Sequence, residues 1–129
     1  MKKQIIHTEN APRAIGIYSQ AVRAGDFLYI SGQIPFVPET MVLVEGGIRE
    51  QVIQVFKNLE AIAQAAGTDL AHAIKLTIYL TDLGDFPIIN EVMAEYVPEP
   101  YPARVTIQVS ALPKGAEVEI DAILLFDNG

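Results

Sequence analysis

The sequence has no cysteine and no tryptophan, and its histidines are His7 and His72 alone. Without cysteine the chain cannot form disulfides, thiolate metal sites, iron–sulfur clusters or a cysteine nucleophile. The two histidines lie too far apart in the sequence to act as a local pair of metal ligands, so we expect no metal site. Any chemistry must therefore use arginine, carboxylates, hydroxyls, backbone amides and water.

Long apolar segments are missing as well. No apolar run approaches the roughly 18 residues that would span a bilayer. The basic residues 1–4 are followed by polar residues 7–10 rather than by the apolar segment of a signal peptide. We therefore expect a soluble, cytoplasmic protein that does not bind membranes.

Positive charge is scarce. Nine Lys and Arg residues stand against sixteen Asp and Glu residues, which gives a net charge of −7. The basic residues are scattered, with no run longer than Lys2-Lys3. Nucleic-acid-binding proteins meet the phosphate backbone with clustered Lys and Arg, so the charge pattern argues against a nucleic-acid partner.

The chain is long enough for one domain and too short for two. Its 129 residues fall in the range of roughly 100 to 200 residues for a single domain. Hydrophobic residues make up 50% of the chain and charged residues 19%, which is typical of a folded chain. We predict one domain over residues 1–129.

Two segments have apolar residues at the three- and four-residue intervals of an amphipathic helix. The first covers residues 48–66 and is followed by Gly67, which we expect to end it in a left-handed cap. The second begins after Asp85, the expected N-cap, and should stop near Val97 because three prolines follow within five residues.

Other segments have the pattern of β-strands. Residues 18–35 predict a hairpin with its turn at Ala24-Gly25-Asp26, because a glycine-containing break separates two β-rich runs. Further strands are predicted at residues 73–81, 104–109 and 117–126, with a short one at residues 41–44. The order of these elements predicts an α+β domain with two helices on one face of a mixed sheet.

The last predicted strand is apolar on both faces at one end. Its even-numbered positions are all apolar, whereas the odd-numbered ones begin with acidic residues and change to Ile123 and Leu125. A strand of this kind must be covered on both sides at that end. We therefore expect the sheet face that the helices leave open to bind another subunit.

Arg104 is the first candidate for a functional side chain. It follows Tyr101-Pro102-Ala103 at the start of a predicted strand, so its guanidinium group emerges from a stiff segment. Such a fork of donors suits bidentate recognition of a substrate carboxylate. The alternative is a structural ion pair with a neighbouring carboxylate, which spacing alone favours.

Three acidic residues form the second candidate. Glu117, Glu119 and Asp121 are predicted to share one strand face, with roughly 6 to 7 Å between successive members. Crowded like charges raise the pKa of carboxyl groups, which could prepare one of them to exchange protons with water. The alternative, favoured by the pattern alone, is a set of solvated surface carboxylates.

Two further features could belong to a binding site. Ser31-Gly32 ends a predicted strand, where glycine allows a ligand to approach the backbone closely, although such a pair is more often a bulge or a turn. Tyr18 could line a pocket, and packing is its default role. From the residues alone we therefore reach an oligomeric α+β domain with an arginine that could bind an acid.

Several short segments, in their order and spacing, resemble the RidA (YjgF) family of reactive intermediate deaminases. The resemblance runs from about Ile5 to Phe126 and implies a chorismate-mutase-like fold with a mixed six-stranded sheet. It also implies a homotrimer with active sites in the clefts between subunits. The segments are Asn10-Ala11-Pro12, Ile15-Gly16-Ile17-Tyr18-Ser19-Gln20-Ala21, Ser31-Gly32-Gln33-Ile34-Pro35, Pro102-Ala103-Arg104, Leu112-Pro113-Lys114-Gly115 and Val118-Glu119-Ile120-Asp121-Ala122.

The resemblance implies the reaction and the residues that carry it. The family hydrolyses 2-imino acids and their enamines, such as 2-iminobutanoate and 2-iminopropanoate, to 2-oxo acids and ammonia, and needs no cofactor. By resemblance, Arg104 would pair with the substrate carboxylate, and Glu119 would activate the attacking water with the hydroxyl of Thr106 near it. The backbone of Gly32 would bind the imine nitrogen or its water.

The remaining roles implied by the resemblance are those of the cleft walls. Tyr18, Ser31 and Asn90 would line the cleft, and Asp121 would be structural.

Two alternative functions stay open. The same cleft could bind small carboxylate metabolites without catalysis, in a regulatory or chaperone-like role. An RNA-directed role is sometimes attached to the family, and the acidic charge argues against it.

Overall fold

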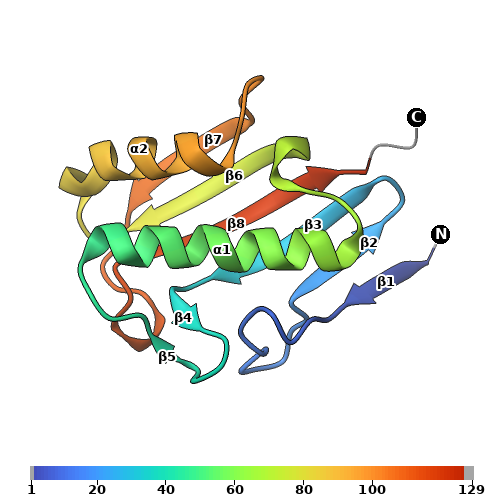
Figure 1. Ribbon diagram of the computed structural model, residues 1–129, viewed down its shortest axis with the longest axis horizontal. Helices are drawn as coiled ribbons and strands as arrows, with labels where there is room; N and C mark the ends of the chain where they lie inside the picture. Colours follow the sequence, from blue (N-terminus) through green and yellow to red (C-terminus); the bar gives the residue numbers. More distant parts are fainter. Residues whose placement is uncertain (1, 127–129) are drawn as a thin grey trace.

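The computed structural model describes residues 2–126, in which two helices cover one face of a six-stranded sheet (Figure 1). The helices are α1 (Ile48–Ala66) and α2 (Phe86–Tyr96). The sheet has the spatial order β1-β2-β3-β8-β6-β7, in which β6 and β7 are parallel and all other neighbours are antiparallel. Its strands are β1 (Lys3–Ile6), β2 (Ala21–Ala24), β3 (Phe27–Gln33), β6 (Ala73–Leu80), β7 (Ala103–Gln108) and β8 (Val118–Leu125).

The predicted fold class, an α+β domain with two helices on one face of a mixed sheet, is confirmed. The parallel pair β6 and β7 needs a crossover, and α2 supplies it. Smaller elements connect the rest: a separate sheet of β4 (Phe36–Val37) and β5 (Val42–Leu43), and three 3₁₀ turns, η1 (Leu70–His72), η2 (Leu83–Asp85) and η3 (Pro113–Gly115). Within residues 2–126, no helix is both long and apolar enough to cross a membrane.

Both helices begin and end close to where the sequence pattern placed them. After α1, Gly67 adopts the left-handed conformation with φ of 94°, and its amide donates to carbonyl groups of the last turn. Helix α2 ends at Tyr96, ahead of the prolines. Asp85 is the N-cap residue of α2, as predicted, with Pro87 in the first turn, although its side chain makes no capping hydrogen bond.

The main sheet contains one strand that was not predicted, and one predicted short strand lies outside it. Strand β1 was not predicted, because four residues with one buried position carry little periodicity. It is stabilised by antiparallel pairing with β2. The strand predicted at residues 41–44 exists as β5, but it pairs with β4 and stays outside the main sheet.

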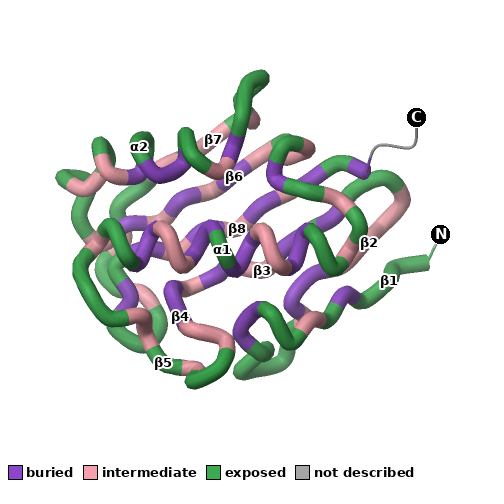
Figure 2. The backbone as a smooth tube through the Cα atoms, viewed as in Figure 1, coloured by how far each residue is buried: buried purple, intermediate pink, exposed green. Residues whose placement is uncertain are grey.

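The core lies between the helices and the sheet, and Figure 2 shows the buried positions along α1 and the central strands. Strands β6 and β8 point alternate side chains into this core, including Leu76, Ile78 and Ile120, all fully buried. The other sheet face has no helix over it. Large apolar side chains remain partly exposed along the strands that form it: Phe27, Tyr29, Val105, Ile107 and Leu125. That a second subunit covers this face stays a prediction.

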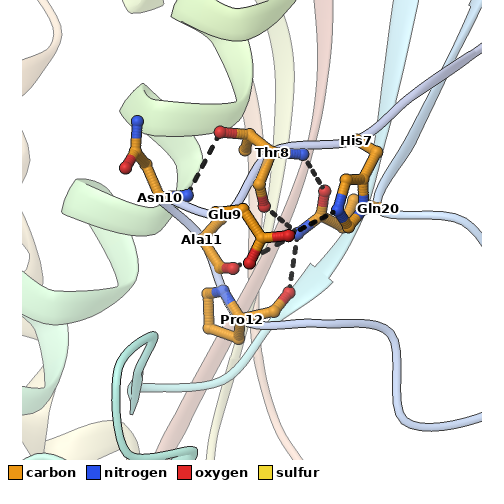
Figure 3. A network of polar contacts seen from close by, with 7 residues as sticks. All are labelled: His7, Thr8, Glu9, Asn10, Ala11, Pro12 and Gln20. Carbon is orange, nitrogen blue, oxygen red and sulfur yellow. Dashed lines mark hydrogen bonds and ion pairs between the residues drawn. The ribbon is translucent and has the colours of Figure 1, made fainter.

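The side chain of Gln20 binds several backbone groups of the loop between β1 and β2 (Figure 3). Gln20 is only 3% exposed. Its Oε1 accepts a hydrogen bond from the Thr8 amide at 2.8 Å, and its Nε2 donates to carbonyl groups of Thr8, Ala11 and Pro12 at 3.0, 3.3 and 2.8 Å. The buried backbone of the loop thus gains the partners that regular secondary structure would provide.

This network predicts the effect of Gln20→Ala. The substitution leaves a buried amide and buried carbonyl groups without partners, so we expect the free energy of unfolding to fall by about 1–3 kcal/mol. Urea denaturation at one protein concentration measures it. Gln64→Ala, at an exposed position of α1, is the matched control and should change stability little. Equal stability of the two variants would contradict the assigned role of Gln20.

Candidate active site

Glu119 lies on the open face of the sheet. Its neighbours Val118 and Ile120 are fully buried under the helices, so the alternation of β8 turns Glu119 to the other side. There it borders a depression of about 320 Å³. We call this the Glu119 depression, and its lining residues are Ile15, Tyr18, Ser31, Gly32, Ile34, Pro113 and Glu119.

A bulge in β3 brings the backbone of Gly32 against Glu119. The pairing register of β3 with β8 shifts between Ile30 and Gln33, which leaves Ser31-Gly32 outside the regular ladder. A Cβ atom at Gly32 would lie 2.2 Å from Oε2 of Glu119, so no larger residue fits without displacing the carboxylate. The Ser31 hydroxyl donates to the Ser19 carbonyl at 2.6 Å and ties the bulge to the N-terminal loop.

The environment of Glu119 raises the pKa of its carboxyl group. Partial burial is the main cause, and the nearby charge of Asp121 adds to it. Asp121 in turn accepts a hydrogen bond from the Tyr79 hydroxyl at 3.2 Å, across the β6–β8 pair. A carboxyl group with a raised pKa exchanges protons more readily near neutral pH.

Glu117 does not share this face, so the prediction of three carboxylates in one row is wrong. Its Oε2 accepts a hydrogen bond from Nε2 of Gln51 on α1 at 2.9 Å, and its backbone amide donates to Oε1 of Gln51 at 3.0 Å. The reason is that Glu117 precedes β8, so the alternation of the strand does not extend to it.

Tyr18 and Ser31 line the depression as the sequence comparison with the family implied. The Tyr18 side chain is 47% exposed, and its hydroxyl accepts a hydrogen bond from the Ile15 amide at 3.1 Å. No periodicity or spacing in the sequence singled out Ile15, Ile34 and Pro113, which are apolar residues in loops and at strand ends. Their role follows from where the chain brings them together.

Arg104 lies on the other face of the sheet, beneath α2. It stands on the edge strand β7 opposite the fully buried Leu76 of β6, and side chains in register on parallel strands share a face. One guanidinium nitrogen donates to Oδ1 of Asn90 at 2.7 Å and lies 3.7 Å from the Met93 sulfur. The guanidinium carbon is 5.0 Å from the centre of the Phe86 ring.

The donors of Arg104 face a second depression, of about 370 Å³. Among residues 2–126 no carboxylate pairs with Arg104, so the alternative of a structural ion pair within the chain is not realised. Phe86, Asn90 and Met93 are spaced so that they lie on one face of α2, where all three contact the Arg104 guanidinium group. This helical spacing is the sequence signal that could have identified Phe86 and Met93. We call this the Arg104 depression, lined by Asn90, Met93, Ala94, Tyr101, Pro102 and Arg104.

Thr106 accompanies Arg104 rather than Glu119. It follows Arg104 by two residues on β7 and is in register with the buried Ile78. Its Oγ1 is buried and has no hydrogen-bond partner in the described part of the chain. The expected closeness of Thr106 to Glu119 is therefore not met within one chain.

The predicted site residues thus fall into two groups on opposite faces of the sheet. Tyr18, Ser31, Gly32 and Glu119 surround one depression, whereas Asn90, Arg104 and Thr106 lie on the helix-covered side at the sheet edge. Within residues 2–126, no group of three or more His, Asp or Glu residues could hold a metal ion. One chain therefore does not itself bring the guanidinium group of Arg104 and the carboxyl group of Glu119 together.

The raised pKa of Glu119 predicts a pH-dependent change in stability. A carboxyl group whose pKa is higher in the folded protein than in the unfolded chain opposes folding once it is charged, so this cost grows as the pH rises through those two values. We expect Glu119→Gln to raise the urea midpoint at neutral pH and to leave it unchanged below the ordinary pKa of glutamate. The exposed Glu39→Gln should change neither midpoint. A lower midpoint for Glu119→Gln at neutral pH would refute the assignment.

Comparison with known proteins gives consistent matches over almost the whole chain. A family model described as endoribonuclease L-PSP matches residues 8–125. A RutC family protein of Pyrococcus horikoshii is 54% identical over 94% of this chain and 96% of its own length. A human protein named 2-iminobutanoate/2-iminopropanoate deaminase is 44% identical over 95% of this chain and 90% of its own.

Solved structures agree with these matches. RidA of an Antarctic Psychrobacter superposes with a TM-score of 0.92 at 53% identity, over 95% of this chain and 99% of that one. TdcF of E. coli with bound serine superposes with a TM-score of 0.89 at 40% identity, over 96% and 99% of the two chains. In sequence and in fold, the chain therefore belongs to the RidA/YjgF family.

Proposed function

We propose that this protein hydrolyses small 2-imino acids, such as 2-iminobutanoate and 2-iminopropanoate, to 2-oxo acids and ammonia. The observation that carries the proposal is the pair of groups described above. Among residues 2–126, Arg104 offers guanidinium donors without a carboxylate partner, and the carboxyl group of Glu119 has a raised pKa and lies against the backbone of Gly32. Relatives at 43% and 44% identity are named for this reaction, which supports it.

Arg104 would bind the substrate carboxylate. A guanidinium group offers two parallel N–H donors that match the two oxygens of a carboxylate. Asn90 and the Phe86 ring hold the guanidinium group in place, so Arg104 loses little conformational freedom when the substrate binds. The relative TdcF, solved with bound serine, holds a ligand with an α-carboxylate.

Glu119 would transfer the protons. The imine reacts as its protonated form, which is already electrophilic. The Glu119 carboxylate accepts a proton from water while the water oxygen bonds to C2 and the C=N electron pair moves to nitrogen, which gives a neutral carbinolamine. Glu119 then returns its proton to the nitrogen. The C–N bond breaks with its electron pair on nitrogen, which leaves as ammonia, while the C2 hydroxyl gives its proton to Glu119 and becomes a carbonyl. Ammonia takes this proton, so that ammonium and the 2-oxo acid leave and the Glu119 carboxylate is restored.

We further propose that each active site forms between two copies of this chain in a homotrimer. The opposite placement of Arg104 and Glu119 supports this arrangement, because a single small substrate cannot reach both faces of one sheet. The apolar side chains left exposed on the open face support association as well. In the assembly, the Arg104 depression of one copy would meet the Glu119 depression of the next.

The reaction is tested with threonine dehydratase and threonine, which supply 2-iminobutanoate, in the presence of semicarbazide as a competing trap. The protein should raise the rate of 2-oxobutanoate formation over that of semicarbazone. Arg104→Ala should lower this effect at least about 30-fold, because the substrate carboxylate loses a desolvated charged partner. No effect by the folded wild type would refute the deaminase and leave a cleft that only binds carboxylates.

The shared site is tested by mixing variants. Arg104→Ala and Glu119→Gln should each be inactive alone, since every site lacks one group. After refolding together at equal amounts, random assembly gives about a quarter of the sites both intact groups, so about a quarter of the wild-type activity should return. Mixed oligomers with no recovered activity would show that both groups act from the same chain.

A further inference from the structure

A third hollow continues from the Glu119 depression along the surface of the same chain. It has a volume of about 760 Å³. A small cavity of about 30 Å³ lies next to both, since it shares Gly32 and Tyr18 with the Glu119 depression and Arg13 and Phe36 with the third hollow. We call the third hollow the basic basin, lined by Arg13, Ile15, Phe36, Met41, Val42, Leu43 and Lys114.

The basic basin has a charge opposite to that of the whole chain. The protein carries a net charge of −7, yet the charged residues at the basin are Arg13 and Lys114 and no Asp or Glu lines it. Neither cation forms an ion pair with a carboxylate among residues 2–126. The floor between them is apolar, with Phe36 almost completely buried. Such a surface suits an acidic group on a short carbon chain.

The backbone is constrained at or next to both basic residues, whose side chains are exposed. Lys114 adopts the left-handed conformation with φ of 60° in the turn η3, which the Ala116 amide closes by donating to the Pro113 carbonyl. Pro113 itself lines the Glu119 depression, so Lys114 follows directly at its border. Arg13 follows Pro12, whose carbonyl is bound by the buried Gln20 (Figure 3). The positive φ of Lys114 is uncommon for a non-glycine residue and points to a constrained turn.

We propose that Arg13 and Lys114 form a subsite for a second acidic group of the substrate, so that 2-imino dicarboxylic acids are preferred over uncharged ones of the same chain length. The inference rests on the proposed function. The α-carboxylate occupies Arg104 of the neighbouring copy and C2 lies beside Glu119. The side chain then extends past Ile15 into the basin, where its terminal carboxylate meets the two cations.

The test compares two imines that differ at the end of the side chain. An amino-acid oxidase with catalase generates them from glutamate, which ends in a carboxylate, and from norvaline, which has the same carbon chain and ends in a methyl group. We expect kcat/KM to favour the glutamate-derived imine. In the double variant Arg13→Gln/Lys114→Asn this preference should fall about tenfold, and added salt should weaken it in the wild type.

The variants are chosen to separate charge from folding. Asparagine tolerates the left-handed conformation of Lys114, and equal urea midpoints verify that the fold is kept. Lys57→Gln, at an exposed position of α1, removes one positive charge away from the basin and should leave the preference unchanged. A preference that is absent in the wild type, or that persists in the double variant, overturns the subsite.

A binding measurement keeps this result distinct from failure of the proposed function. Calorimetric titration with 2-oxoglutarate and 2-oxopentanoate, the corresponding products, needs no turnover. Tighter binding of the dicarboxylate, lost in the double variant, supports the subsite even if neither imine is hydrolysed, an outcome that would refute the deaminase alone. Equal binding of the two acids by the wild type, with hydrolysis of the norvaline-derived imine intact, refutes the subsite alone.

Discussion

Alternation of side chains along a β-strand is the constraint that divides this site. Strands β7 and β8 belong to one sheet, separated by β6, and each directs successive side chains to opposite faces. Arg104 shares its face with Leu76 in the core, whereas Glu119 shares its face with Tyr79 and Asp121 on the open side. The two groups with the clearest chemistry therefore point away from each other, and a second copy of the chain is the simplest way to oppose them.

Local irregularities, rather than the regular ladder, shape the Glu119 side. The bulge places Gly32 beside the Glu119 carboxylate, and the absence of a side chain on Gly32 leaves room for that carboxylate. The loop that borders it has little secondary structure of its own and depends on the buried amide of Gln20. A regular part of the sheet supplies the carboxylate, and two irregular segments supply its surroundings. This division is common where a rigid scaffold positions functional loops.

The local charge at the Arg104 depression and at the basic basin differs in sign from the net charge of the protein. An acidic surface repels anions at long range, so binding of a carboxylate, as proposed, would need cations concentrated near the site. Arg104 borders one depression, and Arg13 and Lys114 border the basic basin. The remaining described arginines have different partners, such as Glu91 for Arg49 and the Phe126 ring for Arg23.

The sequence by itself determined the local structure: the span of α1 and its glycine cap, the end of α2, the hairpin, and Arg104 at the start of a strand. These features depend on residues within a few positions of each other, which periodicity and proline or glycine signals report. The resemblance to a known family added the site residues, but not their arrangement in one chain. Only the tertiary structure decided that β1 joins the sheet, that Glu117 binds α1 through Gln51, and that Arg104 and Glu119 lie on opposite faces. Each of these outcomes depends on pairing between segments far apart in the chain, and a pattern within one segment carries no information about its distant partner.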